Sequence, residues 1–130
     1  MVFLDSDLMI GVLRKDAAAI RALSDIENRG GPLRTTVINA VELVEGAVMS
    51  RKEGAVHTVD SFLATLEMLH LDSLAASLAG QIIGNLKLRG EQIDNMDALI
   101  GSITIAHNET LVTRNVKHFG RIKGLKVETW

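Results

Sequence analysis

Cysteine is absent from this chain of 130 residues, and so are other residues that many functions require. Without thiols the chain has no disulfide framework, no cysteine-ligated zinc site and no cysteine nucleophile. Tyrosine is also absent, and aromatic residues make up 3% of the chain, too few for a surface on which nucleic-acid bases stack. The formal net charge of −2 argues against binding to nucleic acid by bulk electrostatic attraction, although it leaves room for a local basic surface.

Several sequence motifs are missing as well. No apolar run approaches the ~20 residues that a membrane-spanning helix needs, and the N-terminal segment carries acids where a signal peptide carries bases. We therefore expect a cytoplasmic protein without a membrane partner. The four histidines are dispersed and form no HExxH, which argues against a zinc site, and there is no Walker loop, GxGxxG or GxSxG.

The composition that is present is typical of one globular domain. Hydrophobic residues make up 47% of the chain and charged residues 23%. A chain of this length buries enough apolar surface to fold without a metal or a disulfide. We expect a single domain over residues 1–130.

Short apolar runs alternate with segments of helical periodicity, which predicts an α/β fold. Strands are expected at 2–4, 33–36, 69–71, 110–113 and 125–128, and helices at 8–14, 16–28, 38–50, 55–69, 73–88 and 94–107. Strands connected by helices favour right-handed crossovers, and hence a mainly parallel sheet with helices on both faces, a three-layer sandwich. In such sheets the chemistry lies at the carboxyl ends of the strands.

Polar residues follow two of these strands. Asp5 comes directly after the apolar run at 2–4, and Arg114 and Asn115 follow Thr113. These strand ends should therefore point into one crevice. Asp7 has two interpretations, as an acid in the first turn of a helix or as part of the site.

Two helices each carry a pair of acids three residues apart, Glu42 with Glu45 and Asp94 with Asp97. Asp94 is expected to be an N-cap, with Asp97 at N3 of a capping-box-like arrangement. The alternative is that Asp97 directs a carboxylate into the interior. Helical periodicity does not decide between Glu42 and Glu45, and slightly favours Glu45.

Converging carboxylates repel one another, by roughly 3 kcal/mol for each pair at ~5 Å and an effective dielectric constant near 20. A positive group must therefore lie among them. Mg²⁺ and Mn²⁺ prefer oxygen ligands, so the sequence favours one of these cations as a cofactor.

Four segments occur in an order and spacing that together are specific: Phe3-Leu4-Asp5-Ser6-Asp7, Val41-Glu42-Leu43-Val44-Glu45-Gly46, Met96-Asp97-Ala98-Leu99-Ile100 and Leu111-Val112-Thr113-Arg114-Asn115. A fifth, from His118-Phe119 to Trp130, completes the pattern. This pattern resembles that of the PIN-domain family, and in particular the VapC-type toxin ribonucleases of toxin–antitoxin pairs.

The resemblance implies a PIN-like sandwich and assigns the site. Asp5, Glu42 and Asp97 correspond to the metal ligands of the family, which selects Glu42 over Glu45. Asn115 takes the fourth catalytic position, where many relatives have Asp, so the number of metal ions stays open. Around these ligands, the supporting residues are expected to be Ser6, Asp7, Asp94 and Thr113.

The resemblance also implies metal-assisted hydrolysis of an RNA phosphodiester. Bases without intervening acids follow the last buried strand: Arg114, Lys117, Arg121, Lys123 and Lys126. They are expected to hold RNA phosphates, and the alternative is a solvated surface loop. The implied partners are a VapB-type antitoxin and a second copy of the chain in a homodimer.

Three other functions remain open at this point. The chain could be an RNA-processing PIN nuclease without an antitoxin, or a PIN module with a degraded site, for which Asn115 is the best support. A strand followed by Asp-x-Asp also opens the haloacid-dehalogenase-like phosphatases, but their Thr/Ser and Lys precede the final acids, whereas Thr113 follows Asp97. The sequence does not identify the RNA.

Overall fold

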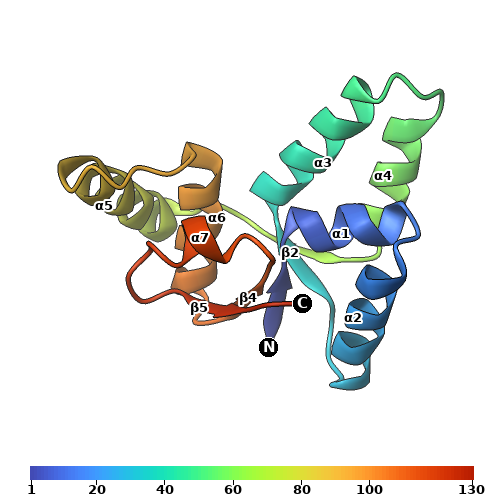
Figure 1. Ribbon diagram of the computed structural model, residues 1–130, viewed down its shortest axis with the longest axis horizontal. Coiled ribbons are helices and arrows are strands. Elements are labelled where there is room, and N and C mark those ends of the chain that lie inside the picture. The colour runs from blue at the N-terminus through green and yellow to red at the C-terminus, as the bar shows by residue number, and fades with distance from the viewer.

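A five-stranded sheet runs through the centre of the computed structural model, which describes residues 1–130 (Figure 1). Its strands are β1 (Val2–Leu4), β2 (Arg34–Thr36), β3 (Glu67–Leu69), β4 (Thr110–Val112) and β5 (Lys126–Glu128). They lie in the order β3-β2-β1-β4-β5, and every neighbouring pair is parallel. The expected parallel sheet is confirmed.

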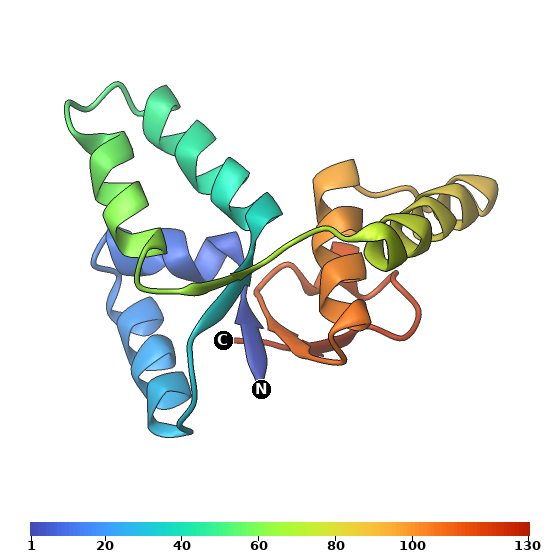
Figure 2. The ribbon, with the colours of Figure 1, turned by 180° about the vertical axis from the view of Figure 1, so that it is seen from behind.

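Helices cover both faces of the sheet, as the sequence predicted. One face carries α1 (Ser6–Leu13), α2 (Ala17–Asn28), α3 (Val37–Met49) and α4 (Ala55–Leu63), and the other carries α5 (Ser73–Leu88), α6 (Asn95–Ala106) and α7 (Val116–Phe119). Figure 2 shows the two groups on opposite sides of the strands. No helix is both long enough and apolar enough to cross a membrane.

Alternating side chains of the central strands divide the core into two layers. Leu4 and Val112 pack into the layer beneath α1–α4, whereas Phe3 and Leu111 pack into the layer beneath α5–α7. Successive side chains of a strand point to opposite faces, so short strands of consecutive apolar residues supply both layers. All four side chains are almost completely buried.

The strand order reverses at β1, and this reversal positions the site. The strands β2 and β3 follow β1 on one side of it, and β4 and β5 lie on its other side. The carboxyl ends of β1 and β4 therefore lie side by side at the point where crossovers diverge, which in open parallel sheets is the usual ligand crevice.

Local sequence signals fix several helix ends. The carboxylate of Asp16 accepts from the backbone N–H of Ala19, and Asp72 caps α5 in the same way through Ala75.

Gly101 allows a close approach on α6, because a Cβ there would lie 2.6 Å from Cδ1 of Ile122. This contact brings the segment after α7 against the helix that carries Asp97.

Some expected boundaries were wrong. The helix expected over 55–69 ends at Leu63, and the strand expected at 69–71 is β3, two residues earlier. Helical periodicity continues through this segment, but pairing of β3 with β2 determines its structure. The basic segment after β4 contains the short helix α7, and the helix expected from residue 8 begins at Ser6.

Candidate active site

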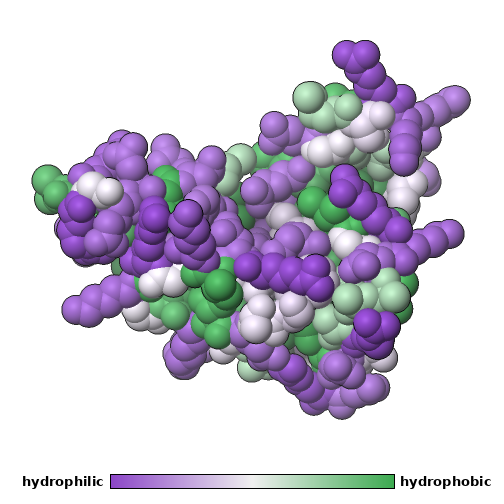
Figure 3. Space-filling model, in the orientation of Figure 1, coloured by the Kyte–Doolittle hydropathy of each residue, from purple (hydrophilic) through white to green (hydrophobic).

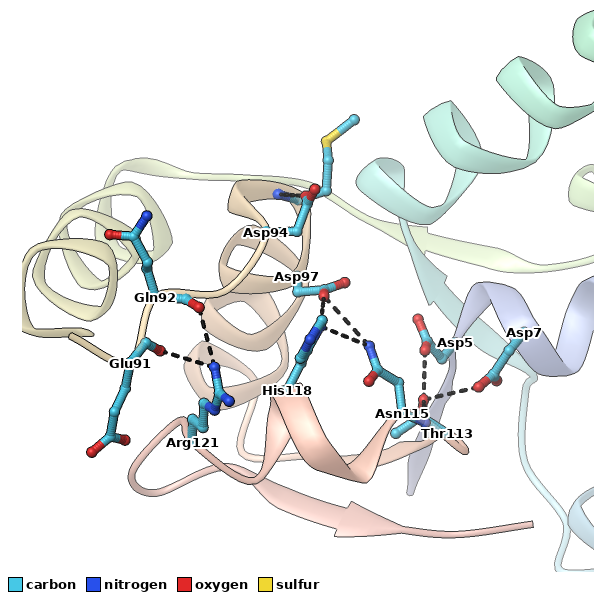
Figure 4. Close-up of polar contacts among 11 residues, drawn as sticks. Asp5, Asp7, Glu91, Gln92, Asp94, Asp97, Thr113, Asn115, His118 and Arg121 are labelled. Atoms are coloured by element: carbon cyan, nitrogen blue, oxygen red, sulfur yellow. Dashed lines mark hydrogen bonds and ion pairs between the residues drawn. The ribbon is translucent and has the colours of Figure 1, made fainter. Parts of the chain in front are cut away.

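The carboxyl ends of β1 and β4 meet through a hydrogen bond between Thr113 and Asp5. The buried Thr113 hydroxyl lies 2.6 Å from Oδ2 of Asp5, whose side chain is also buried. Asn115 is tied to the same hydroxyl, because its backbone N–H donates to Thr113 Oγ1 at 3.0 Å. The two strand ends therefore share one crevice, as the sequence predicted (Figure 4).

Glu42 reaches this crevice from α3. The hydroxyl of Ser6, the first residue of α1, donates to Oε1 of Glu42 at 2.7 Å. Glu45, one turn further along, is exposed, so the slight preference that periodicity gave it was wrong. Periodicity favours Glu45 because it lies between Val41 and Val48 around the helix. The exposed fractions of these two valines are 50% and 61%, however, and α3 buries Asn39, Leu43 and Ala47 instead.

Asp97 reaches the crevice from the first turn of α6. Its Oδ2 lies 3.4 Å from Nδ2 of Asn115 and 3.2 Å from Nδ1 of His118. Asp94 caps α6 by accepting from the backbone N–H of Met96 at 2.8 Å, as expected. The capping-box-like role for Asp97 was wrong, because its carboxylate contacts the segment around α7 rather than the start of its own helix.

The site carboxylates are held in surroundings that oppose their ionisation. Burial raises the pKa of Asp5 from 3.8 to about 6, although the hydrogen bond from Thr113 lowers it. Burial is also the main cause that raises the pKa of Glu42 and of Asp97. Repulsion from Asp97 and from Asp94 raises the pKa of Glu42 further, whereas the hydrogen bond from Ser6 lowers it.

Sequence reasoning missed two residues that contact these carboxylates. Asn39 is completely buried, and its Nδ2 donates to Oδ1 of Asp5 and to Oγ of Ser6, both at 2.9 Å. An amide within the apolar run that begins α3 was the available signal. The sequence analysis treats His118 as one of four dispersed histidines that form no zinc motif, whereas its ring lies against Asp97.

Asp7 supports the site through the backbone and the end of the sheet. Its Oδ2 accepts from the backbone N–H of Arg114 at 2.8 Å and lies 3.2 Å from the Thr113 hydroxyl. Its Oδ1 accepts from the indole N–H of Trp130 at 3.0 Å. Asp7 is thus an acid in the first turn of α1, and it also contacts Thr113, the residue that donates to Asp5.

The carboxylate oxygens of the site are the kind of ligand that a hard divalent cation prefers, but they do not lie close enough together to surround one. Carboxylates line the crevice, and the nearest basic side chain to them is His118, beside Asp97. No three His, Asp or Glu side chains are arranged so that they could hold a metal ion. The oxygen donors of Asp5, Glu42 and Asp97 fit such a cation in chemistry, and these three residues would hold it if their carboxylates came closer together.

Comparison with known proteins decides the family. The family model described as PIN domain matches residues 2–125. The chain belongs to the PIN-domain family. It is 30% identical over 128 residues to Ribonuclease VapC2 of Rickettsia felis, covering 98% of this chain and 96% of that protein. It is 33% identical to the tRNA(fMet)-specific endonuclease VapC of Salmonella typhimurium, over 72% of this chain and 71% of that protein.

The fold of this PIN domain also matches that of one chain in a solved complex. The crystal structure of VapBC2 from Rickettsia felis bound to a DNA fragment from their promoter contains a chain that superposes with a TM-score of 0.86, at 28% identity. The match covers 100% of this chain and 99% of that one. Membership in the PIN-domain family, within its VapC group, makes the haloacid-dehalogenase interpretation wrong.

The basic residues of the PIN domain differ in their surroundings. Lys117 and Lys123 are exposed and form no salt bridge. Arg121 donates instead to the backbone carbonyls of Glu91 and Gln92, at 3.4 and 3.2 Å.

Arg114 and Lys126 lie at opposite ends of the neighbouring strands. The guanidinium of Arg114 stacks 3.6 Å from the ring centroid of Trp130, beside the acids, whereas Lys126 contacts Asn108 at the start of β4. Figure 3 shows that this face is hollowed between the α3–α4 side and the α5–α7 side, and that hydrophilic residues line most of the hollow.

Proposed function

We propose that this PIN domain is a metal-dependent endoribonuclease and the toxin of a VapBC-type pair. The observation that carries the proposal is the hydrogen-bond network that links Asp5, Glu42 and Asp97 at the switch point of the sheet, in a chain of the VapC group. Relatives named ribonuclease VapC cover nearly the whole chain, which supports RNA as the substrate class.

Asp5, Glu42 and Asp97 would hold Mg²⁺ or Mn²⁺. A bound cation of this kind polarises a scissile phosphate, stabilises the developing charge and lowers the pKa of a bound water. Ser6 holds the carboxylate of Glu42, Thr113 holds that of Asp5, and Asn115 contacts that of Asp97. The amide of Asn115 supplies no negative charge at the fourth position, so we favour a single cation site.

Lys117 lies in α7 and Lys123 follows it, and both are the best placed of the basic residues to contact RNA phosphates, since neither forms a salt bridge or a side-chain hydrogen bond. Because a relative is named for tRNA(fMet), initiator tRNA belongs in any substrate panel. The solved VapBC complex supports a VapB-type antitoxin as the partner of this chain. We also expect a homodimer and a cytoplasmic location.

The test is RNA cleavage by matched variants. Purified protein is incubated with initiator tRNA, other tRNAs and single-stranded RNA, with Mg²⁺ or Mn²⁺ and with EDTA. The wild type should cleave at least one RNA only when the cation is present. Glu42→Gln should lower the rate by more than about 100-fold, beyond the effect typical of residues that only support metal ligands.

Glu45→Gln is the matched control, since it makes the same chemical change one turn along α3 on an exposed side chain. It should retain the wild-type rate. Cleavage that persists in EDTA, or that is unaffected by Glu42→Gln, contradicts the proposal. A wild type that binds a VapB-type antitoxin but cleaves no RNA would instead support the inactive interaction module.

A further inference from the structure

Asn39 occupies a position where a polar side chain needs an explanation. It lies in the first turn of α3, and its exposed fraction is 0%. A buried amide is costly unless it is hydrogen-bonded, and every polar atom of this one has a partner. The partners are Thr36 on one side and Asp5 and Ser6 on the other.

The hydrogen bonds around Asn39 form a chain in which each donor follows from the one before, from Thr36 through Asn39 to the two acids. The Thr36 hydroxyl donates to Oδ1 of Asn39 at 2.7 Å, which turns the NH₂ group toward Asp5 and Ser6. The opposite amide orientation would place the carbonyl oxygen against the carboxylate of Asp5, where the two oxygens repel. Since Ser6 accepts from Asn39, its own hydrogen is free to point to Glu42, 2.7 Å away.

Capping of α3 does not account for this arrangement. Thr36 is the N-cap residue, and it caps the helix by accepting from the backbone N–H of Asn39 at 3.2 Å. Any residue other than proline at position 39 supplies that backbone donor. The side-chain amide is therefore available for the two acids, one directly and one through Ser6.

We propose that Asn39 is a positioning residue that sets the carboxylates of Asp5 and Glu42 relative to each other for a shared divalent cation. This inference rests on the proposed metal-dependent function. Residues that orient metal ligands typically change metal affinity or activity by 10- to 100-fold when they are substituted. Asn39 acts through Asp5 and Ser6, and no contact of its own with RNA is required.

The experiment measures the Mn²⁺ dissociation constant of the RNA-free protein by isothermal titration calorimetry, together with the melting temperature. Asn39→Ala should weaken Mn²⁺ binding by about 10- to 100-fold. Its kcat should fall at limiting Mn²⁺ and recover toward the wild-type value at saturating Mn²⁺. The KM for RNA should stay unchanged, because the RNA contacts are intact.

Thr104→Val is the matched control, because Thr104 is completely buried and donates its hydroxyl to a backbone carbonyl, that of Ile100, away from the acids. It should lower the melting temperature while leaving the Mn²⁺ dissociation constant within about twofold, since only metal-orienting contacts carry the larger effect. If Asn39→Ala is not folded at the assay temperature, Asn39→Leu, which keeps the branching of the side chain at Cγ but removes the amide, should show the same weakened binding.

A double substitution tests the route to Glu42. Ser6→Ala removes the link between Asn39 and Glu42, so the combined loss of affinity in Ser6→Ala with Asn39→Ala should be smaller than the product of the single losses. Wild-type Mn²⁺ affinity in a folded Asn39 variant, or multiplicative losses in the double variant, would overturn the proposal. Failure of the wild type to bind Mn²⁺ would overturn the proposed function instead.

Discussion

Thr113 and Asp5 lie 108 residues apart in the sequence, yet their side chains are joined by a hydrogen bond of 2.6 Å. The Thr113 hydroxyl has one hydrogen but two carboxylate neighbours, and Asp7 is the more distant, at 3.2 Å. The hydrogen therefore goes to Asp5, while Asp7 is bound by the N–H groups of Arg114 and Trp130. The two neighbouring acids therefore have different surroundings: Asp5 accepts from the Thr113 hydroxyl at the site, whereas Asp7 accepts from Arg114 and Trp130 at the end of the sheet.

Thr113→Val should shift the pH dependence of the reaction to higher pH. The hydrogen bond from Thr113 lowers the pKa of Asp5, so its removal raises that pKa above about 6 and leaves less ionised Asp5 near neutral pH. The measurement is the pH profile of kcat/KM for RNA cleavage. An acid limb at the wild-type position in a folded Thr113→Val protein contradicts this account.

Asp5 should make the protein less stable at neutral pH than in mild acid. Its pKa is raised from 3.8 to about 6 in the folded state, so the folded protein binds the proton more tightly than the unfolded chain. The contribution of Asp5 to the free energy of unfolding is thus most favourable below about pH 4. It falls as the pH rises through about 6, by about 3 kcal/mol in all.

Asp5→Asn removes this titration and is the direct test. The melting temperature of Asp5→Asn relative to the wild type should increase as the pH is raised from 4 to 7, even though cleavage is lost. Denaturation of both proteins across this pH range measures the difference. A difference that stays constant with pH would show that Asp5 does not titrate near pH 6.

Trp130→Phe should destabilise the fold through Asp7. The substitution removes the indole N–H that donates to Asp7 but keeps an aromatic ring beneath Arg114. Loss of a hydrogen bond to a charged group costs about 1–3 kcal/mol, which urea denaturation can resolve. A free energy of unfolding equal to that of the wild type would mean that Asp7 is held by its backbone partner alone.

Lys117→Ala and Arg121→Ala should have different effects, although both were expected from the sequence to bind RNA. Lys117 is exposed, so its removal should weaken RNA binding and reduce the slope of log K against log salt by about 1. Arg121 bonds to the carbonyls of Glu91 and Gln92, so its removal should mainly lower the melting temperature. An unchanged salt slope in Lys117→Ala would contradict its contact with phosphate.

Local patterns predicted the parts of the site that lie on well-defined elements. Asp5 was evident because it ends an apolar strand, and the parallel sheet followed from the alternation of strands and helices. The segment 64–69 was misassigned, because pairing of β3 with β2 is a long-range interaction that periodicity does not contain. The same limitation explains the uncertainty over Glu42 and Glu45.

The supporting residues of the site were harder to predict than the acids. Asn39 and His118 matter because of contacts with Asp5 and Asp97, which are 34 and 21 residues away in the sequence. Such contacts leave no spacing pattern. A polar residue inside an apolar helical run, as at Asn39, is the one local sign that a buried partner is required.

The most direct test of the account is the anomalous diffraction of a Mn²⁺-soaked crystal. The account predicts one Mn²⁺ peak at the carboxyl ends of β1 and β4, with carboxylate oxygens of Asp5, Glu42 and Asp97 drawn to within about 2.0–2.2 Å, the range of hard-cation ligands of similar size. The same soak of Glu42→Gln should lose the peak. A wild-type crystal that cleaves RNA but places Mn²⁺ away from these three carboxylates would contradict it.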